Sequence, residues 1–161
     1  MPLDQRELRN ALGGFCTGVT VVTTRTPEGA PVGVTISSFN AVSLDPPLVL
    51  FSLDRRAHAL AQFEQAGRFA VNVLAQGQAR LCARFAQPVG DDWSGIDSLD
   101  WVTGAPILTG CVSNFDCRTY RVHDGGDHRI FLGEVVRMRT AADLPPMVYY
   151  RGGFHRLHAD A

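Results

Sequence analysis

The segment TGVTVVTTRTPEGAPVGVTISS, residues 17–38, contains two runs of β-branched residues separated by a Pro-Glu-Gly turn. Residues 17–25 and 32–36 favour strands, because branched side chains pack well on a pleated surface. Proline and glycine are typical of the tight turn between two such strands. The segment therefore predicts an antiparallel hairpin.

The same kind of pattern continues on both sides of this hairpin. Short apolar runs bounded by proline or glycine predict further strands at residues 46–53, 68–74, 112–122, 130–138 and 147–150. Apolar residues at helical spacing predict helices at residues 3–12, where Asp4 is the expected N-cap, and at 57–66 and 76–85. Residues 87–104 carry both tryptophans and predict a long lid or binding loop. Because strands outnumber helices and do not alternate with them, we expect a mainly β fold, a closed antiparallel barrel with a few peripheral helices.

Composition limits the class of protein. The 161 residues fit a single domain that spans residues 1–161. Fifteen basic and sixteen acidic residues, with no basic run, argue against nucleic acid or an anionic membrane surface as a partner. The four cysteines form no C-x-x-C pair, which favours reduced thiols in a cytosolic protein. The polar N-terminus and the lack of a long apolar run predict a cytoplasmic protein with no membrane segment.

The stretch HDGGDHRIFLGEV, residues 123–135, sets two aspartates and two histidines around a glycine pair. Gly125 and Gly126 predict a two-residue hairpin turn, because such turns need positive φ angles. A metal site is disfavoured, since adjacent residues at a hairpin tip point to opposite faces. The polar residues are therefore either solvated tip residues or include one histidine that serves a ligand.

The stretch GVTISSFNAVSLDPPLVLFSL, residues 33–53, concentrates small polar side chains before a buried strand. Thr35, Ser37, Ser38 and Asn40 fit either a serine-rich turn or a loop that donates hydrogen bonds to a phosphate or a polar ring.

Three other polar residues allow two readings each. Arg55 and Arg56 follow a strand and precede a helix, so they are either a solvated pair or a clamp for a phosphate. Asn72 interrupts an apolar run, and a buried amide needs partners, which backbone groups or a ligand ring could supply.

Several common chemistries have no motif in this chain. There is no G-x-G-x-x-G after a strand, no G-x-S-x-G and no G-K-[ST], which argues against a Rossmann site, a serine-hydrolase elbow and a phosphate loop.

Six blocks together resemble the flavin reductase-like family, the small reductase components of two-component flavin monooxygenases. The blocks are FCTGVTVVTT, GVTISSFNAVSLDPPLVLFSL, FAVNVLAQGQARLCARFA, GAPILTGCVSNFDC, GGDHRIFLGEV and VYYRGGFHRL, in the family's order. The resemblance implies an FMN-binding split β-barrel that binds FMN or FAD, as a homodimer with the flavin near the subunit interface.

The activity that the resemblance implies is oxidation of NADH or NADPH by flavin. Hydride passes between two cofactors, so no nucleophile or metal is needed. Free reduced flavin then reaches a separate flavin-dependent monooxygenase. The alternatives are an FMN-dependent oxidoreductase with tightly bound flavin, acting on a small molecule held by the loop that carries Trp93 and Trp101, and a non-catalytic flavin-binding protein.

The resemblance also implies site residues. Residue Ala57 departs from the serine or threonine of many relatives, which leaves more of the phosphate contact to Arg55 and Arg56. His128 is the implied catalytic residue, which positions nicotinamide or donates to a cofactor and does not abstract a proton. The implied cofactor-binding residues are Thr35, Ile36, Ser37, Ser38, Asn40, Ser52, Leu53, Asp54, Arg55, Arg56, Asn72, Phe85, His128 and Tyr149.

Overall fold

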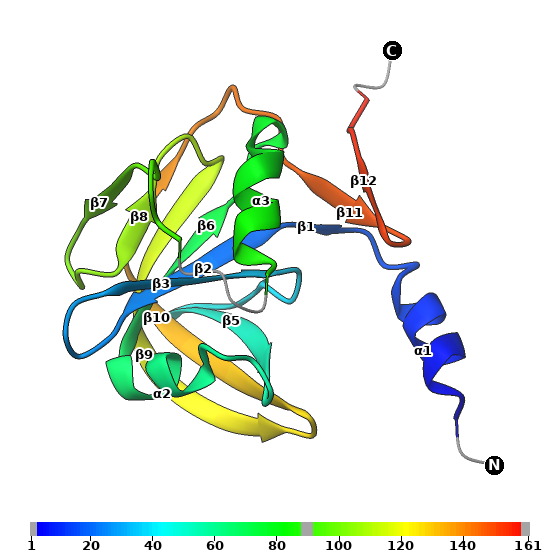
Figure 1. The fold of residues 1–161 in the computed structure, drawn as a ribbon, viewed down its shortest axis with the longest axis horizontal. Coiled ribbons are helices and arrows are strands. Elements are labelled where there is room, and N and C mark those ends of the chain that lie inside the picture. Colours follow the sequence, from blue (N-terminus) through cyan, green and yellow to red (C-terminus); the bar gives the residue numbers. More distant parts are fainter. Residues whose placement is uncertain (1–2, 88–91, 159–161) are drawn as a thin grey trace.

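The computed structural model describes residues 3–87 and 92–158, and its main element is a seven-stranded antiparallel sheet (Figure 1). Every strand pairing in this sheet is antiparallel, as the sequence predicts. In spatial order the strands are β3 (Pro31–Ile36), β2 (Thr20–Arg25), β6 (Arg68–Val73), β9 (Ser113–Gly125), β10 (His128–Thr140), β5 (Pro47–Asp54) and β4 (Asn40–Leu44).

Smaller elements surround this sheet. Helix α1 (Gln5–Leu12) has Asp4 as its N-cap, as expected, because the carboxylate accepts hydrogen bonds from the Arg6 and Glu7 amides. Figure 1 shows α1 projecting from the body on the side of the C-terminal strands. The other elements are β1 (Thr17–Gly18), β11 (Val148–Tyr150) and β12 (Gly153–His155) in one sheet, β7 (Ser98–Asp100) and β8 (Pro106–Leu108) in another, and helices α2 (Leu60–Ala66), η1 (Gln76–Gln78) and α3 (Ala79–Phe85).

The expectation of a closed barrel is wrong. In the part of the chain that the structure describes, β3 and β4 are the two edges of the main sheet and do not pair. The reason is that β4 folds back onto β5 and occupies the edge that closure with β3 would require. A side chain spans the opening instead: Ser38 Oγ donates to the Ser52 carbonyl and accepts from the Ser52 amide, both at 2.9 Å.

Local differences from the sequence prediction are confined to short elements. Strands β4, β8 and β12 were not expected, and β7 lies inside residues 87–104, where the sequence predicts a loop; residues 88–91 of that loop are outside the described residues. The hairpin tip is also shifted by one residue: Gly125 pairs with His128, so Gly126, with φ +72°, and Asp127 form the turn.

An aromatic core packs against one face of the main sheet. The Phe51 ring stacks on Phe131 and meets Phe69 edge-on, with both centroid distances at 4.9 Å. Gly133 of β10 lies under this cluster, where a Cβ would overlap the Phe69 ring and sit 3.0 Å from Cys117 Cβ. The register between β9 and β10 shifts beside Gly133, where Tyr120 of β9 has no partner in β10, so a β-bulge lies next to the position at which the ring needs room.

Gly133→Ala is therefore expected to lower the free energy of unfolding by about 1–3 kcal/mol, because Phe69 must move from its packed position. Urea denaturation monitored by circular dichroism measures the change. Gly77→Ala is the matched control, since a Cβ there meets nothing within 4 Å and no positive φ is required. Equal stability of Gly133→Ala and the wild type would contradict this account of the close approach between Gly133 and Phe69.

Ser38→Ala removes both hydrogen bonds between the loop after β3 and the Ser52 backbone. We expect the free energy of unfolding to fall by about 1–3 kcal/mol, because the Ser52 amide and carbonyl lose their side-chain partner. Ser37→Ala, at the exposed neighbouring position, should change it by less than about 0.5 kcal/mol. The same urea titration separates the two variants, and an equal effect of both would show that Ser38 does not span the opening.

Candidate functional site

A pocket of about 780 Å³ lies where the open edge of the sheet meets the β9–β10 hairpin. Its volume is within the roughly 300–1,000 Å³ range of small-molecule and cofactor sites. The end of β3 and the loop after it contribute one wall through Thr35, Ile36, Ser37 and Ser38.

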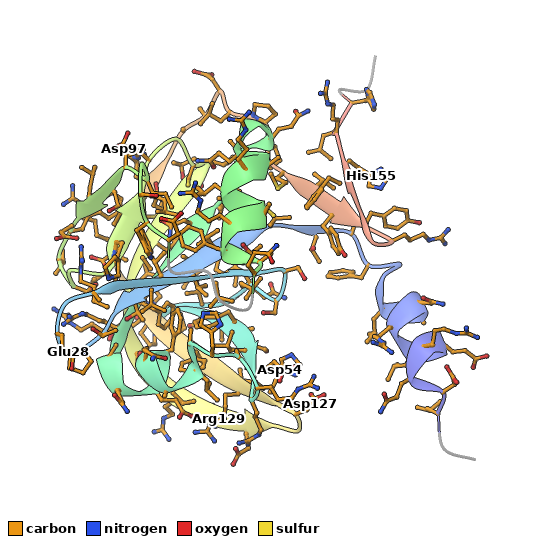
Figure 2. The ribbon with its side chains drawn as sticks, viewed as in Figure 1. Glu28, Asp54, Asp97, Asp127, Arg129 and His155 are labelled. Atoms are coloured by element: carbon orange, nitrogen blue, oxygen red, sulfur yellow. The ribbon has the colours of Figure 1, made fainter. Side chains whose placement is uncertain are left out.

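The end of β5 and the start of β10 form the facing wall. Strand register places His128 opposite Asp54 and Ile130 opposite Ser52, so residues far apart in sequence meet at this rim. Ser52, Leu53, Asp54 and His128 all line the pocket. Figure 2 shows Asp54, Asp127 and Arg129 at this same end of the sheet.

The C-terminal hairpin supplies an aromatic side. Tyr149 of β11 and Phe154 of β12 line the pocket and are cross-strand partners, with ring centroids 5.7 Å apart. Together with Val34, Leu53 and Ile130 they give the site apolar surfaces, while the hydroxyl groups add polar contacts. Such a lining suits a flat ring system that needs both stacking and a few hydrogen bonds.

Charges at the rim are paired within the chain. Asp54 accepts from the Arg56 guanidinium at 3.0 and 3.2 Å and from the Arg56 amide at 2.8 Å. These bonds lower the pKa of Asp54 to about 2, so its carboxylate stays charged at neutral pH. His128 Nδ1 lies 2.7 Å from Asp127 Oδ1, and its side chain is 42% exposed. This bond orients the imidazole beside the pocket.

Arg55 contacts the hairpin tip and is not among the described residues that line the pocket. Its Nε donates to the Gly126 carbonyl at 2.9 Å, and its guanidinium forms an ion pair with Asp124. Hydrogen bonds from Arg129 and Arg55 lower the pKa of the Asp124 carboxyl. The carboxylate therefore stays charged and holds both arginines.

Asn72 is fully buried, and protein groups satisfy its amide. It donates to the Val21 carbonyl at 2.9 Å and to Thr23 Oγ1 at 3.1 Å. Its carbonyl accepts from the Leu108 amide at 2.9 Å and from Asn114 Nδ2 at 2.8 Å. The side chain thus connects β2, β6, β8 and β9 in the core. Of the two readings of Asn72, this arrangement matches the one in which protein groups, and not a ligand ring, bind the amide.

Three other residues that the resemblance implies, Arg56, Phe85 and Asn40, also lie off the described lining. Phe85 is 1% exposed and packs on Trp93 with ring centroids 4.9 Å apart, and it fills the space beside Gly33, which has no Cβ. Asn40 is exposed on β4, and its side-chain oxygen accepts a hydrogen bond from the Ala41 amide. The second tryptophan of the predicted loop, Trp101, stacks with Arg137 at 4.5 Å.

Several lining residues were not predicted from the sequence. Ile130 had a signal, since it lies two positions after His128 and so shares its face of the strand. Cys82 lies in α3, and Ala86 caps the C-terminus of this helix one turn later. Burial raises the pKa of the Cys82 thiol, which keeps the thiol neutral. The full set that the sequence analysis missed is Val19, Val34, Ala57, Cys82, Ala86, Gly125, Ile130 and Phe154.

Neither a metal-binding cluster nor a membrane-spanning helix occurs in residues 3–87 and 92–158. Among these residues no three His, Cys, Asp or Glu side chains form a group that could hold a metal ion. No helix in the same two stretches is both long and apolar enough to cross a bilayer.

Known proteins resemble this chain in sequence and in fold, over most of its length. The flavin reductase like domain family matches residues 12–158. The chain is 43% identical to HsaB, the reductase subunit of a flavin-dependent monooxygenase from Rhodococcus jostii, over 98% of this chain and 80% of the relative. It is 44% identical to SmoA, an FMN reductase (NADH) from Agrobacterium fabrum, over 95% of this chain and 86% of the relative.

A solved structure agrees with these sequence matches. The NADH:FAD oxidoreductase SgcE6 of Streptomyces globisporus, in complex with NAD and FAD fragments, superposes with a TM-score of 0.92 at 38% identity, covering 98% of this chain and 95% of the other. The chain described here belongs to the flavin reductase-like family.

Proposed function

We propose that the protein is an NAD(P)H-dependent flavin reductase, which transfers hydride from nicotinamide to FMN or FAD and supplies the reduced flavin to a separate flavin-dependent monooxygenase. The observation that carries this proposal is the 780 Å³ pocket, with hydroxyl groups on one wall, aromatic rings on another and His128 at the rim. The names of the relatives support it, since HsaB is a monooxygenase reductase subunit and SmoA an FMN reductase.

The pocket residues fit a flavin by the chemistry of their side chains. Ser37 offers a hydroxyl group to a polar ring edge or a ribityl chain, and Tyr149 and Phe154 offer aromatic surface. The hydroxyls of Thr35 and Ser38 donate to the Cys82 and Ser52 carbonyls, so toward a ligand they can act only as acceptors. A bound flavin supplies the redox chemistry by accepting hydride from the nicotinamide. The work of this chain is to bind, orient and shield both rings.

His128 has a distinct task in this proposal. The bond to Asp127 occupies Nδ1 and leaves Nε2 to hydrogen-bond a ligand at the pocket rim. We assign His128 to the positioning of nicotinamide. Because alignment of two rings governs the rate once both are bound, loss of the imidazole should reduce turnover more than flavin affinity.

The test is a spectrophotometric assay of NADH and NADPH oxidation with FMN, FAD and riboflavin supplied in turn. Consumption of nucleotide that depends on added flavin is expected in at least one pairing, and His128→Ala should lower kcat about 10–100-fold. Flavin affinity, measured by fluorescence quenching, should change less than about two-fold in that variant.

His123→Ala is the matched control, because His123 is exposed on the same hairpin and is not among the described lining residues. It should retain the wild-type rate. No consumption in any pairing would refute the proposed function, and unchanged turnover of His128→Ala would refute the role of that residue alone.

We also propose that the protein is a homodimer. Helix α1 has no buried residue, and the chain just after it contacts the C-terminal hairpin, where the Arg151 amide donates to the Gly13 carbonyl at 2.9 Å. We call residues 5–15 together with residues 148–157 the projecting arm. A protein rarely leaves so many large apolar groups in water, and a second copy of the chain would cover them. The arm exposes Leu8 (45%), Leu12 (65%), Phe15 (75%), Phe154 (58%) and Leu157 (65%).

Leu12→Asp is expected to shift the protein from dimer to monomer, because it places a charge on the apolar face of the projecting arm. Size-exclusion chromatography with light scattering measures the mass directly. Leu99→Asp is the control, since Leu99 is 48% exposed on β7, on the opposite side of the body from α1 (Figure 1). A wild-type protein that is monomeric, or a Leu12→Asp variant that stays dimeric, would contradict this interface.

A further inference from the structure

The β9–β10 hairpin tip is held against the end of β5 by Arg55, the first residue after that strand. The Arg55 amide donates to the Asp127 carbonyl at 2.9 Å, and Arg55 Nε donates to the Gly126 carbonyl at 2.9 Å. The guanidinium also forms an ion pair with Asp124. One residue therefore contacts three of the four positions that precede His128.

Asp124 joins this contact to the strand that follows the turn. Its carboxylate pairs with Arg129 as well as with Arg55, and Arg129 Nε lies 2.9 Å from Glu64 Oε1 on α2. We call Arg55, Asp124, Arg129 and Glu64 the hairpin clasp. A single exposed ion pair contributes little, but a linked set with bonds to turn carbonyls restricts several side chains together.

His128 lies between the two halves of the hairpin clasp. The Arg55 bonds fix residues 124, 126 and 127 before it, and the Arg129 bonds fix the residue after it. Asp127, whose carbonyl Arg55 holds, is also the partner of His128 Nδ1 at 2.7 Å. The clasp therefore fixes both the backbone of His128 and the carboxylate that orients its ring.

We propose that Arg55 is a positioning residue for hydride transfer, which acts through His128 and does not bind a phosphate. This inference rests on the proposed function. The geometry supports it because the guanidinium already forms an ion pair with Asp124 and donates to the Gly126 carbonyl. Arg55 is also not among the described residues that line the pocket. A displaced imidazole would misalign the nicotinamide while leaving the flavin walls intact.

The test is a double-mutant cycle between Arg55→Met and His128→Ala. Arg55→Met should lower kcat about ten-fold in the wild-type background, with flavin affinity changed less than about two-fold. In the His128→Ala background the same substitution should change kcat by less than about two-fold, because the residue through which Arg55 acts is gone. Arg55→Lys, which keeps a charge for Asp124, should lose less activity than Arg55→Met.

Hydrogen exchange of the hairpin amides provides a readout that does not depend on activity. Arg55→Met should accelerate exchange at residues 122–130. Arg25→Met is the matched control, because Arg25 likewise donates Nε to a carbonyl, that of Gly104, and pairs with a carboxylate, that of Asp100. It should alter neither hairpin exchange nor kcat. If Arg55→Met fails to fold, Asp124→Asn breaks the ionic part of the clasp with little change in shape, and should show the same pattern at smaller amplitude.

The proposal would be overturned by unchanged hairpin exchange in Arg55→Met, by an equal loss of kcat in both backgrounds, or by a loss of flavin affinity that matches the loss of rate. The last result would assign Arg55 to the phosphate. A wild-type protein that oxidises no nucleotide with any flavin would refute the proposed function, and the Arg55 role with it. An active wild type with a fully active Arg55→Met would refute the Arg55 role alone.

Discussion

The contact between the Phe69 ring and the bare backbone of Gly133 governs the shape of the main sheet. Strands β9 and β10 are each thirteen residues long, and a hairpin of that length must coil to cover a core. The missing Cβ of Gly133 admits the ring, and Gly133 lies within residues 128–134 of β10, the stretch that pairs with β5. The pocket depends on this pairing, because its register brings His128 to the end of β5 beside Asp54.

Internal pairing of charges decides how the pocket can hold an anionic ligand. Arg56 forms an ion pair with Asp54, and Arg55 forms one with Asp124. Each guanidinium therefore has a carboxylate beside it when an anionic ligand approaches. A phosphate approaching this rim would compete with those carboxylates, and most of the binding free energy would come from apolar walls and hydroxyl groups. In the proposed function, where reduced flavin leaves for another protein, moderate affinity of this kind suits a product that must be released.

The sequence predicts the long strands well because apolar and β-branched residues recur along them and glycine or proline lies at their turns. It does not predict β4, β7, β8 or β12. These strands have three to five residues each, too few for an alternation of apolar and polar residues to be recognised. The error about barrel closure has a single cause: the sequence does not reveal that the exposed strand β4 pairs with β5 and leaves β3 as an edge. Pairing partners are set by tertiary contacts, which periodicity does not report.

The site shows the same limit at the level of single residues. The loop after β3 and the end of β5 were identifiable, because hydroxyl groups cluster there next to a buried strand. Phe154 reaches the pocket from near the C-terminus, and its own sequence neighbourhood gives no sign of this.

Asn72 illustrates why a polar residue in an apolar run is ambiguous. An amide side chain offers two donor hydrogens and one acceptor oxygen, and a ligand can use only what the protein leaves unbound. In Asn72 the nitrogen has two protein partners and the oxygen two more, all at 3.1 Å or less. A direct flavin contact would require one of these buried bonds to open, which costs about 1–3 kcal/mol unless the ligand replaces it. Asn72 therefore influences the pocket through the strands it joins, whereas His128, which has one ring nitrogen bound and the other at the rim, can serve a ligand without such a cost.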